Sequence, residues 1–266
     1  MMNVVWSLDR NYLRCFKVSV YSFLTNVTKY AYSDISIHFI IIDDIEDDIR
    51  KFMKSIGFDG KVSYSFTNFS VIADSIAYDK RLSPASSMRL MIPGFIEGIV
   101  LYADCDTMFN GDPSDLMNFD LDGKPIAVKR DLDASWFYSD DSFSQIGFND
   151  RKSRLSYFNA GVMLIDCDKA LDGFMKAKKL LQENQYKHAE QDALNIVFKD
   201  DCALLPNKFN HFTERDTSFW GFTDEPDVLH FTMDRNKPWI GDHSNCGNRW
   251  CSEWLHYDSV IKQLES

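Results

Sequence analysis

The sequence predicts an α/β fold in which a mostly parallel central sheet is flanked by helices. Short apolar runs alternate with segments whose apolar residues recur at helical spacing, and the alternation repeats along the chain. The 266 residues, 45% of them hydrophobic, can bury one substantial core. We therefore expect one domain that spans residues 1–266.

The alternation is clearest in the first half of the chain. Residues 3–7 are apolar enough for a short buried strand, and Leu13, Phe16, Val20 and Phe23 then recur at helical spacing. The same reasoning predicts the elements that follow: strands over 35–42, 62–66 and 99–102, and helices over 45–56 and 86–95.

The second half of the chain continues the pattern. An apolar strand is predicted over 158–165 and a final helix over 190–198. The helix between them presents one apolar face, made by Leu171, Phe174, Ala177 and Leu181. Residues 131–154 are polar and aromatic without periodicity, which predicts a long loop or lid.

Charge and hydropathy exclude several kinds of partner. The net charge of -11, without a basic run, opposes binding to nucleic acid or to an anionic membrane surface. The N-terminus reaches Asp9 and Arg10 too soon for a secretory signal, and no apolar stretch is long enough to cross a bilayer. We expect a cytoplasmic protein with no transmembrane segment.

The six cysteines are scattered along the chain, which suits reduced thiols in a cytosolic protein rather than a disulfide framework. One cluster carries side chains of the kind that bind zinc: His243, Cys246, Cys251 and His256. Its spacings match no common zinc-finger pattern, so we interpret the cluster as local packing.

Carboxylates follow three of the predicted strands. Asp9, Asp43 and Asp104 lie where strands end, and ligands of parallel sheets gather at the carboxyl ends of the strands. The acidic residues over 43–48 also suit the start of a helix, where carboxylates stabilise the helix dipole. We interpret that run as a helix start rather than as a metal site.

The strongest local signal is a strand that runs directly into two carboxylates, Asp104 and Asp106. Such a pair can share one divalent ion, which would attract a diphosphate and stabilise charge on the leaving oxygen. The pair could instead begin a surface turn before residues 110–113. A haloacid-dehalogenase-like phosphatase is another interpretation, but Met108 stands where its motif needs Thr or Val.

Several short motifs occur in a fixed order from Val4 to Trp239. They are Ser7-Leu8-Asp9-Arg10-Asn11-Tyr12, Ser87-Met88-Arg89-Leu90, Tyr102-Ala103-Asp104-Cys105-Asp106, Phe158-Asn159-Ala160-Gly161-Val162, Glu190-Gln191-Asp192, His230-Phe231 and Lys237-Pro238-Trp239. In this order they resemble glycosyltransferase family 8, which includes glycogenin and bacterial lipopolysaccharide galactosyl- and glucosyltransferases. The resemblance implies a single-domain, nucleotide-sugar-binding fold of the GT-A type.

The resemblance also implies roles for particular residues. Asp104, Asp106 and His230 would hold a metal, with Mn²⁺ favoured and Mg²⁺ as the alternative. Arg89 and Lys237 would face the diphosphate or the sugar. Other matching positions would bind the substrate: Ser7, Asp9, Asn11 and Tyr12 at the uridine, and Cys105, Asn159, Ala160, Glu190 and Gln191 elsewhere in the donor site.

One position departs from the family pattern. No glycine lies between His230 and Lys237, where the family usually has one. A close backbone contact to phosphate is therefore not expected in this loop. Arg235 or Asn236 is the candidate replacement.

The implied reaction is transfer of a hexose from UDP-galactose or UDP-glucose to a glycan acceptor with retention, in bacterial lipopolysaccharide, O-antigen or capsule synthesis. We favour a front-face route in which Gln191 stabilises the reacting carbon through its carbonyl dipole. Asp192 is the alternative covalent nucleophile. A non-catalytic sugar-nucleotide or glycan binder is the rival from another class.

Overall fold

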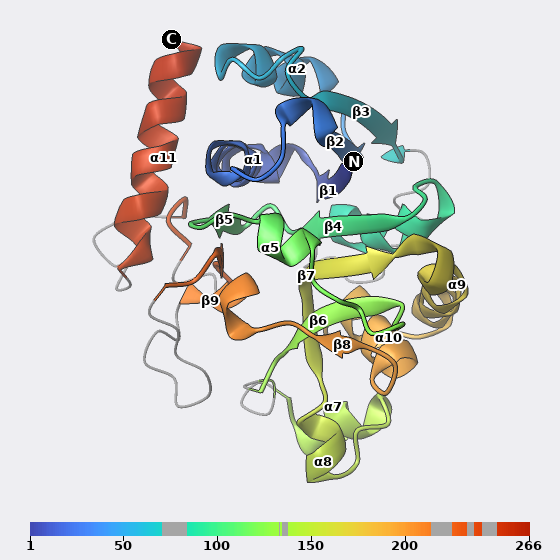
Figure 1. The fold of residues 1–266 in the computed structure, drawn as a ribbon. Helices are drawn as coiled ribbons and strands as arrows, with labels where there is room; N and C mark the ends of the chain where they lie inside the picture. The colour runs from blue at the N-terminus through green and yellow to red at the C-terminus, as the bar shows by residue number, and fades with distance from the viewer. Residues whose placement is uncertain (71–83, 133, 135–137, 214–224, 233–236, 241–248) are drawn as a thin grey trace.

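The computed structural model describes residues 1–70, 84–132, 134, 138–213, 225–232, 237–240 and 249–266. Its main sheet has the strand order β3-β2-β1-β4-β7-β6-β8 (Figure 1). The strands are β1 (Met2–Leu8), β2 (Ile35–Ile41), β3 (Ser63–Asn68), β4 (Ile99–Ala103), β6 (Ile126–Arg130), β7 (Phe158–Asp166) and β8 (Ala203–Leu204). Only β7 runs against its neighbours among these strands, so the predicted mostly parallel sheet is confirmed.

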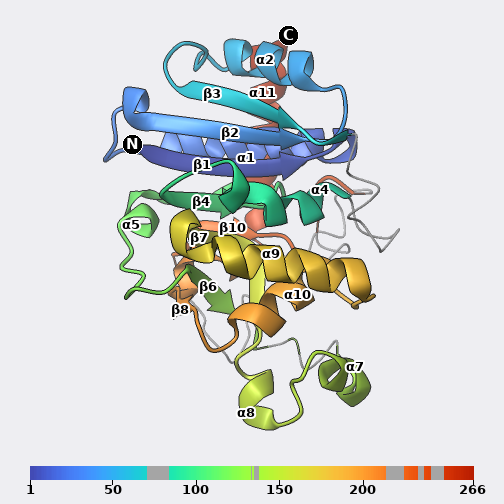
Figure 2. The ribbon, with the colours of Figure 1, turned by 90° about the vertical axis from the view of Figure 1, so that its right-hand side faces the viewer.

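Helices cover both faces of this sheet because its strands are apolar on both sides. In β1, Val4 and Trp6 belong to a core shared with α1 (Leu13–Asn26), α2 (Glu46–Ser55) and α11 (Trp250–Glu265). Val5, on the opposite face, packs in a second core with α9 (Cys167–Glu183), α10 (Ala189–Phe198) and the 3-10 helix η3 (Met88–Gly94). Figure 2 shows α9 and α10 in front of the sheet. This double cover matches the expected fold class.

A second sheet was not predicted from the sequence. It contains β5 (Thr107–Phe109), β10 (Val228–His230) and β9 (His211–Phe212), with β10 in the middle. These strands have only two or three residues each, too few for a pattern with a period of two to be recognised. The sheet nevertheless sets the register of His230 opposite Thr107, just after the two carboxylates.

Two predicted segments differ in detail. The helix expected over 86–95 is a short helix α4 (Pro84–Ser87) followed by η3, which contains Pro93 and therefore lacks one backbone donor. The described part of 131–154 contains α7 (Asp140–Gln145) and α8 (Arg151–Arg154). Phe143 of α7 packs with Tyr138, Phe148 and Tyr157 in a small core, so the segment is more than a loop.

The acidic run over 43–48 does begin a helix: Glu46, Asp47 and Asp48 form the first turn of α2.

Four cysteines among the described residues have free thiols, but Cys251 is disulfide-bonded, so the expectation of reduced thiols is wrong for that residue. Spacing along the chain could not show which cysteines meet in space. Two residues of the candidate zinc cluster, His243 and Cys246, lie outside the described residues. No helix in the described ranges is both long and apolar enough to span a bilayer.

Candidate active site

A cavity of about 240 Å³ opens at the carboxyl ends of β1 and β4. Most of the residues predicted for the site line it: Ser7, Tyr12, Arg89, Asp104, Cys105, Asp106, Asn159, Glu190, Gln191, His230 and Lys237. Asp9, Asn11, Ala160 and Asp192 are not in its lining. The fold thus gathers residues from distant segments at the place where a parallel sheet binds its ligands.

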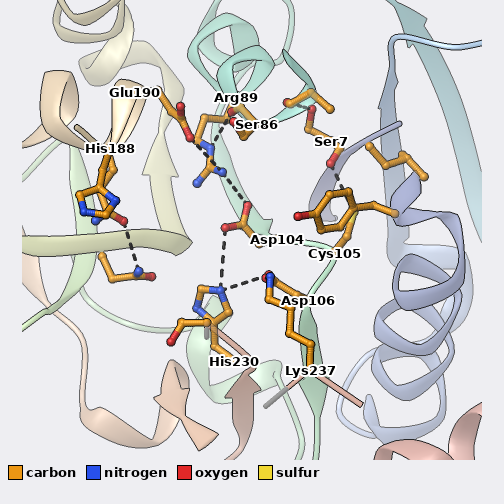
Figure 3. Close-up of a pocket in the computed structure, with 16 residues that line it drawn as sticks. Ser7, Ser86, Arg89, Asp104, Cys105, Asp106, His188, Glu190, His230 and Lys237 are labelled. Carbon is orange, nitrogen blue, oxygen red and sulfur yellow. Dashed lines mark hydrogen bonds and ion pairs between the residues drawn. The ribbon is translucent and has the colours of Figure 1, made fainter. Parts of the chain in front are cut away.

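Three side chains form a candidate metal site. Asp104, Asp106 and His230 offer ligand atoms that all lie within 4.8 Å of one another. His230 Nε2 is 3.1 Å from Asp106 Oδ1 and 4.0 Å from Asp104 Oδ2, and Figure 3 shows the three side chains turned toward one another. Two carboxylates and one imidazole fit a divalent transition metal and neutralise its formal charge.

Gly161 makes room for this cluster. A Cβ atom at that position would lie 2.2 Å from His230 Cε1 and 2.8 Å from Asp104 Oδ2. The Gly161 carbonyl also accepts a 2.7 Å hydrogen bond from the Asp104 amide. The requirement for glycine here comes from the close approach of two ligand side chains to the backbone of β7.

Lys237 balances the charge of the second carboxylate. Its Nζ atom lies 3.0 Å from Asp106 Oδ2, and both side chains are largely buried. Burial alone would raise the pKa of Asp106, but the positive charge of Lys237 and the contact with His230 outweigh it and hold the pKa below its ordinary value. Asp106 is therefore ionised and ready to bind a cation.

Arg89 and Tyr102 hold the first carboxylate. Arg89 Nη2 is 2.8 Å from Asp104 Oδ1, and the Tyr102 hydroxyl donates to the same oxygen at 2.6 Å. Oδ2, the oxygen nearer His230, is thereby directed toward the cluster. Burial raises the pKa of Asp104 above its usual value, and Arg89 opposes that shift. Arg89 also contacts Glu190 Oε1 at 3.4 Å, so it connects Asp104, just after β4, to α10.

The opposite end of the cavity is formed by the loop after β1. The Asp9 carboxylate accepts a 3.1 Å hydrogen bond from the Tyr12 amide and so caps the turn that presents the Tyr12 ring. Ser7 donates to the Ala85 carbonyl, and the Cys105 thiol donates to the Ser7 carbonyl at 3.3 Å. Burial raises the pKa of Tyr12 to about 12, so the ring is uncharged at neutral pH.

Hydrogen bonds hold both the oxygen and the nitrogen of the Gln191 side-chain amide. Its Oε1 atom accepts from the Ala160 amide at 3.0 Å and from Asn159 Nδ2 at 3.2 Å, while Nε2 donates to the Tyr157 hydroxyl at 3.0 Å. Ala160, outside the cavity lining, thus acts through its backbone. These bonds fix which end of the amide faces β7.

Asp192 lies behind Gln191 and is fully buried. Its carboxylate accepts hydrogen bonds from the Tyr157 hydroxyl at 2.6 Å, from the Tyr138 hydroxyl, and from the His188 amide at 2.9 Å. Burial, with the charge of Asp192 adding to it, raises the pKa of Tyr157 well above its usual value, so this phenol remains a donor. In this arrangement Asp192 joins α10 to the aromatic core of residues 134–157.

Sequence reasoning did not single out several residues that complete the site. Gly161 lay inside a recognised motif, but nothing in the sequence shows that a side chain there would strike His230. Tyr102, Tyr157 and Asn210 contact the predicted residues through hydrogen bonds that only the folded chain creates. Asn210 in particular lies outside all of the motifs that carry the family resemblance.

A mostly parallel sheet with two carboxylates after the end of β4, joined there by an imidazole and two buried cations from other segments, has the arrangement of a GT-A-type glycosyltransferase. The chain belongs to glycosyltransferase family 8, whose family model matches residues 3–242. The family predicted from the motifs is therefore confirmed.

Proteins of similar sequence carry names that agree with this family. The chain is 27% identical over 219 residues to a lipopolysaccharide 1,2-glucosyltransferase of Escherichia coli K12, covering 79% of this chain and 62% of the relative. It is 25% identical over 233 residues to glycosyltransferase GlyA of Streptococcus pneumoniae, covering 81% of this chain and 30% of that one. The chain thus spans less than two thirds of either relative.

Solved structures confirm the fold. The galactosyltransferase LgtC, solved with donor and acceptor sugar analogs, superimposes with a TM-score of 0.77 at 21% identity, covering 97% of this chain and 96% of LgtC. Glycosyltransferase GlyE of Streptococcus pneumoniae gives a TM-score of 0.68 at 22% identity, with coverage of 98% and 62%. The predicted GT-A-type fold is therefore confirmed.

Proposed function

We propose that this glycosyltransferase moves galactose or glucose from a UDP-sugar to a glycan acceptor, with retention and with Mn²⁺ as its metal. Mg²⁺ is the alternative ion. The names of the relatives support a hexose donor and an acceptor in bacterial surface glycans such as lipopolysaccharide. The observation that carries the proposal is the cluster of Asp104, Asp106 and His230 beside Lys237 and Arg89 in one cavity.

The proposed donor site contains three groups of side chains, one for each part of the UDP-sugar. Tyr12 would stack on the uracil, with Ser7, Asp9 and Asn11 on the same loop. Lys237 and Arg89 would attract the diphosphate into an otherwise acidic cavity. When bound, the metal supplies positive charge that stabilises the diphosphate as it leaves. Glu190, Asn159 and Gln191 would surround the sugar.

The contacts of Gln191 and Asp192 favour the front-face route over a covalent one. An amide oxygen that already accepts two hydrogen bonds is a weak nucleophile, so Gln191 would act through its dipole. The Asp192 carboxylate is bonded to two tyrosine hydroxyls and one backbone amide, which stabilise its charge and lower its nucleophilicity. The departing diphosphate would then accept the proton of the acceptor hydroxyl.

The activity can be tested with the purified chain, Mn²⁺ and a panel of UDP-sugars by measuring released UDP in the presence and absence of EDTA. A hexosyltransferase releases UDP with one or two of these donors, and only with metal. A non-catalytic binder would bind the nucleotide sugar without release. A phosphatase would release inorganic phosphate instead.

Asp192→Asn separates the two mechanisms. We expect measurable transfer to remain, because the front-face route needs no carboxylate at this position. Loss of the charged acceptor should also destabilise the fold by about 1 to 3 kcal/mol, which thermal unfolding would measure. Asp200→Asn, on an exposed residue nearby, is the control. Complete loss of transfer with intact donor binding would favour the covalent route.

A further inference from the structure

A chain of hydrogen bonds connects the candidate metal site to the small core that contains Tyr138, Phe143 and Tyr157, and each side chain donates to the next. Its members, in order, are His230, Asn210, Asn159, Gln191, Tyr157 and Asp192. Asn210 has no part in the sequence motifs, is fully buried and is not in the lining of the cavity.

The direction of the chain follows from the Gln191 amide. The Ala160 amide can only donate, so the Gln191 atom that faces β7 is the acceptor Oε1. Gln191 Nε2 then donates to the Tyr157 hydroxyl, which donates in turn to the Asp192 carboxylate. Asn159 consequently turns its Nδ2 group toward Gln191 and its Oδ1 atom away.

The near end of the chain determines the state of the imidazole. Asn159 Oδ1 accepts from the Gly161 amide at 2.9 Å and from Asn210 Nδ2 at 3.0 Å. Asn210 therefore presents Oδ1 to His230 Nδ1, 2.9 Å away, and Nδ1 must carry the proton. Nε2, the atom that faces the two aspartates, is left as the nitrogen that can bind a metal.

We infer that Asn210 is a positioning residue that holds His230 in its metal-binding tautomer and, through the same amide, holds Asn159 against Gln191. This inference rests on the proposed metal-dependent function. Because Asn210 is outside the cavity lining, its effects pass through His230 on one side and Asn159 on the other. Metal affinity and the orientation of the groups around the donor sugar are thereby linked by one side chain.

Two substitutions separate these two contacts. Asn210→Leu keeps a similar volume but removes both, so Mn²⁺ affinity should fall by about 10- to 100-fold, as for other lost partners of metal-bound histidines. Asn210→Asp still accepts from His230 Nδ1 but cannot donate to Asn159. We expect it to bind Mn²⁺ within about threefold of the wild type while kcat falls by about 10-fold or more.

Mn²⁺ binding would be measured by electron paramagnetic resonance on the full chain without nucleotide, and kcat and KM by UDP release. Asn195→Leu is the matched control, since Asn195 is equally buried and makes a similar number of hydrogen bonds, to Phe158 and the Gln191 carbonyl, without touching a metal ligand. That variant should lose stability but keep the wild-type Kd for Mn²⁺.

Nuclear magnetic resonance of protein labelled with ¹⁵N-histidine tests the tautomer without metal. The His230 signal would be assigned by comparison with His230→Gln. A protected Nδ1 proton should be present in the wild type and in Asn210→Asp and lost in Asn210→Leu. Wild-type Mn²⁺ affinity or an unchanged Nδ1 proton in Asn210→Leu would overturn the inference. If no UDP-sugar is turned over but these binding and proton signals behave as expected, the proposed function fails and the role of Asn210 stands.

Discussion

Replacing Asp106 by asparagine is expected to lower metal-dependent UDP release by about 100- to 1,000-fold. Asp106 is the carboxylate that faces both His230 and Lys237, at 3.1 Å and 3.0 Å. Asparagine keeps the shape of the side chain but removes the negative charge that offsets the positive charge of the metal. Only one carboxylate, Asp104, would then hold the ion against water. UDP release across a Mn²⁺ titration measures the effect.

Asp115→Asn is the control for the general loss of one acidic charge, because Asp115 is half-exposed and pairs with Lys29 on the surface. It should leave the titration unchanged. Circular dichroism would establish that the Asp106 variant is folded, and a partial recovery at high Mn²⁺ would show that affinity is what has been lost. Full activity at low Mn²⁺ in Asp106→Asn would contradict the metal assignment.

Gly161→Ala should cause the next largest change, although glycine and alanine differ by one methyl group. That methyl would sit 2.2 Å from His230 Cε1, so the imidazole or the strand must move. A displaced ligand is expected to weaken Mn²⁺ binding by at least about 10- to 100-fold. The overpacked site should also lose about 1 to 3 kcal/mol of unfolding free energy, measured in EDTA so that metal loss does not contribute.

The comparison variant for Gly161→Ala is Gly94→Ala, at a glycine whose added Cβ would meet no atom within 4 Å. Gly94 ends η3, away from the three candidate ligands. This variant should bind Mn²⁺ like the wild type. If Gly161→Ala also bound with an unchanged Kd, the three side chains would not be the ligands, or the site would tolerate a shift that its packing argues against.

Much of the fold could be predicted because long buried elements carry their periodicity in the sequence. The strands β1, β2 and β4 were predicted near their observed limits, and the helices α1 and α9 were predicted from their apolar faces. The antiparallel direction of β7 was not, since an apolar run is the same in either orientation. Helix α11 was not predicted either. In the folded chain it is held to α1 by hydrogen bonds from Arg14 to Asp258.

For the candidate site, the sequence by itself determined which chemistry is present: a strand that ends in Asp104 and Asp106, and motifs whose order identifies the family. The tertiary structure decided how those groups act together. It brings Lys237 to Asp106 across 131 positions of sequence and leaves room for His230 only because residue 161 has no side chain. It also aligns the buried amides that orient the imidazole. Hydrogen-bond direction and steric clearance depend on packing between distant segments, which no local pattern of residues encodes.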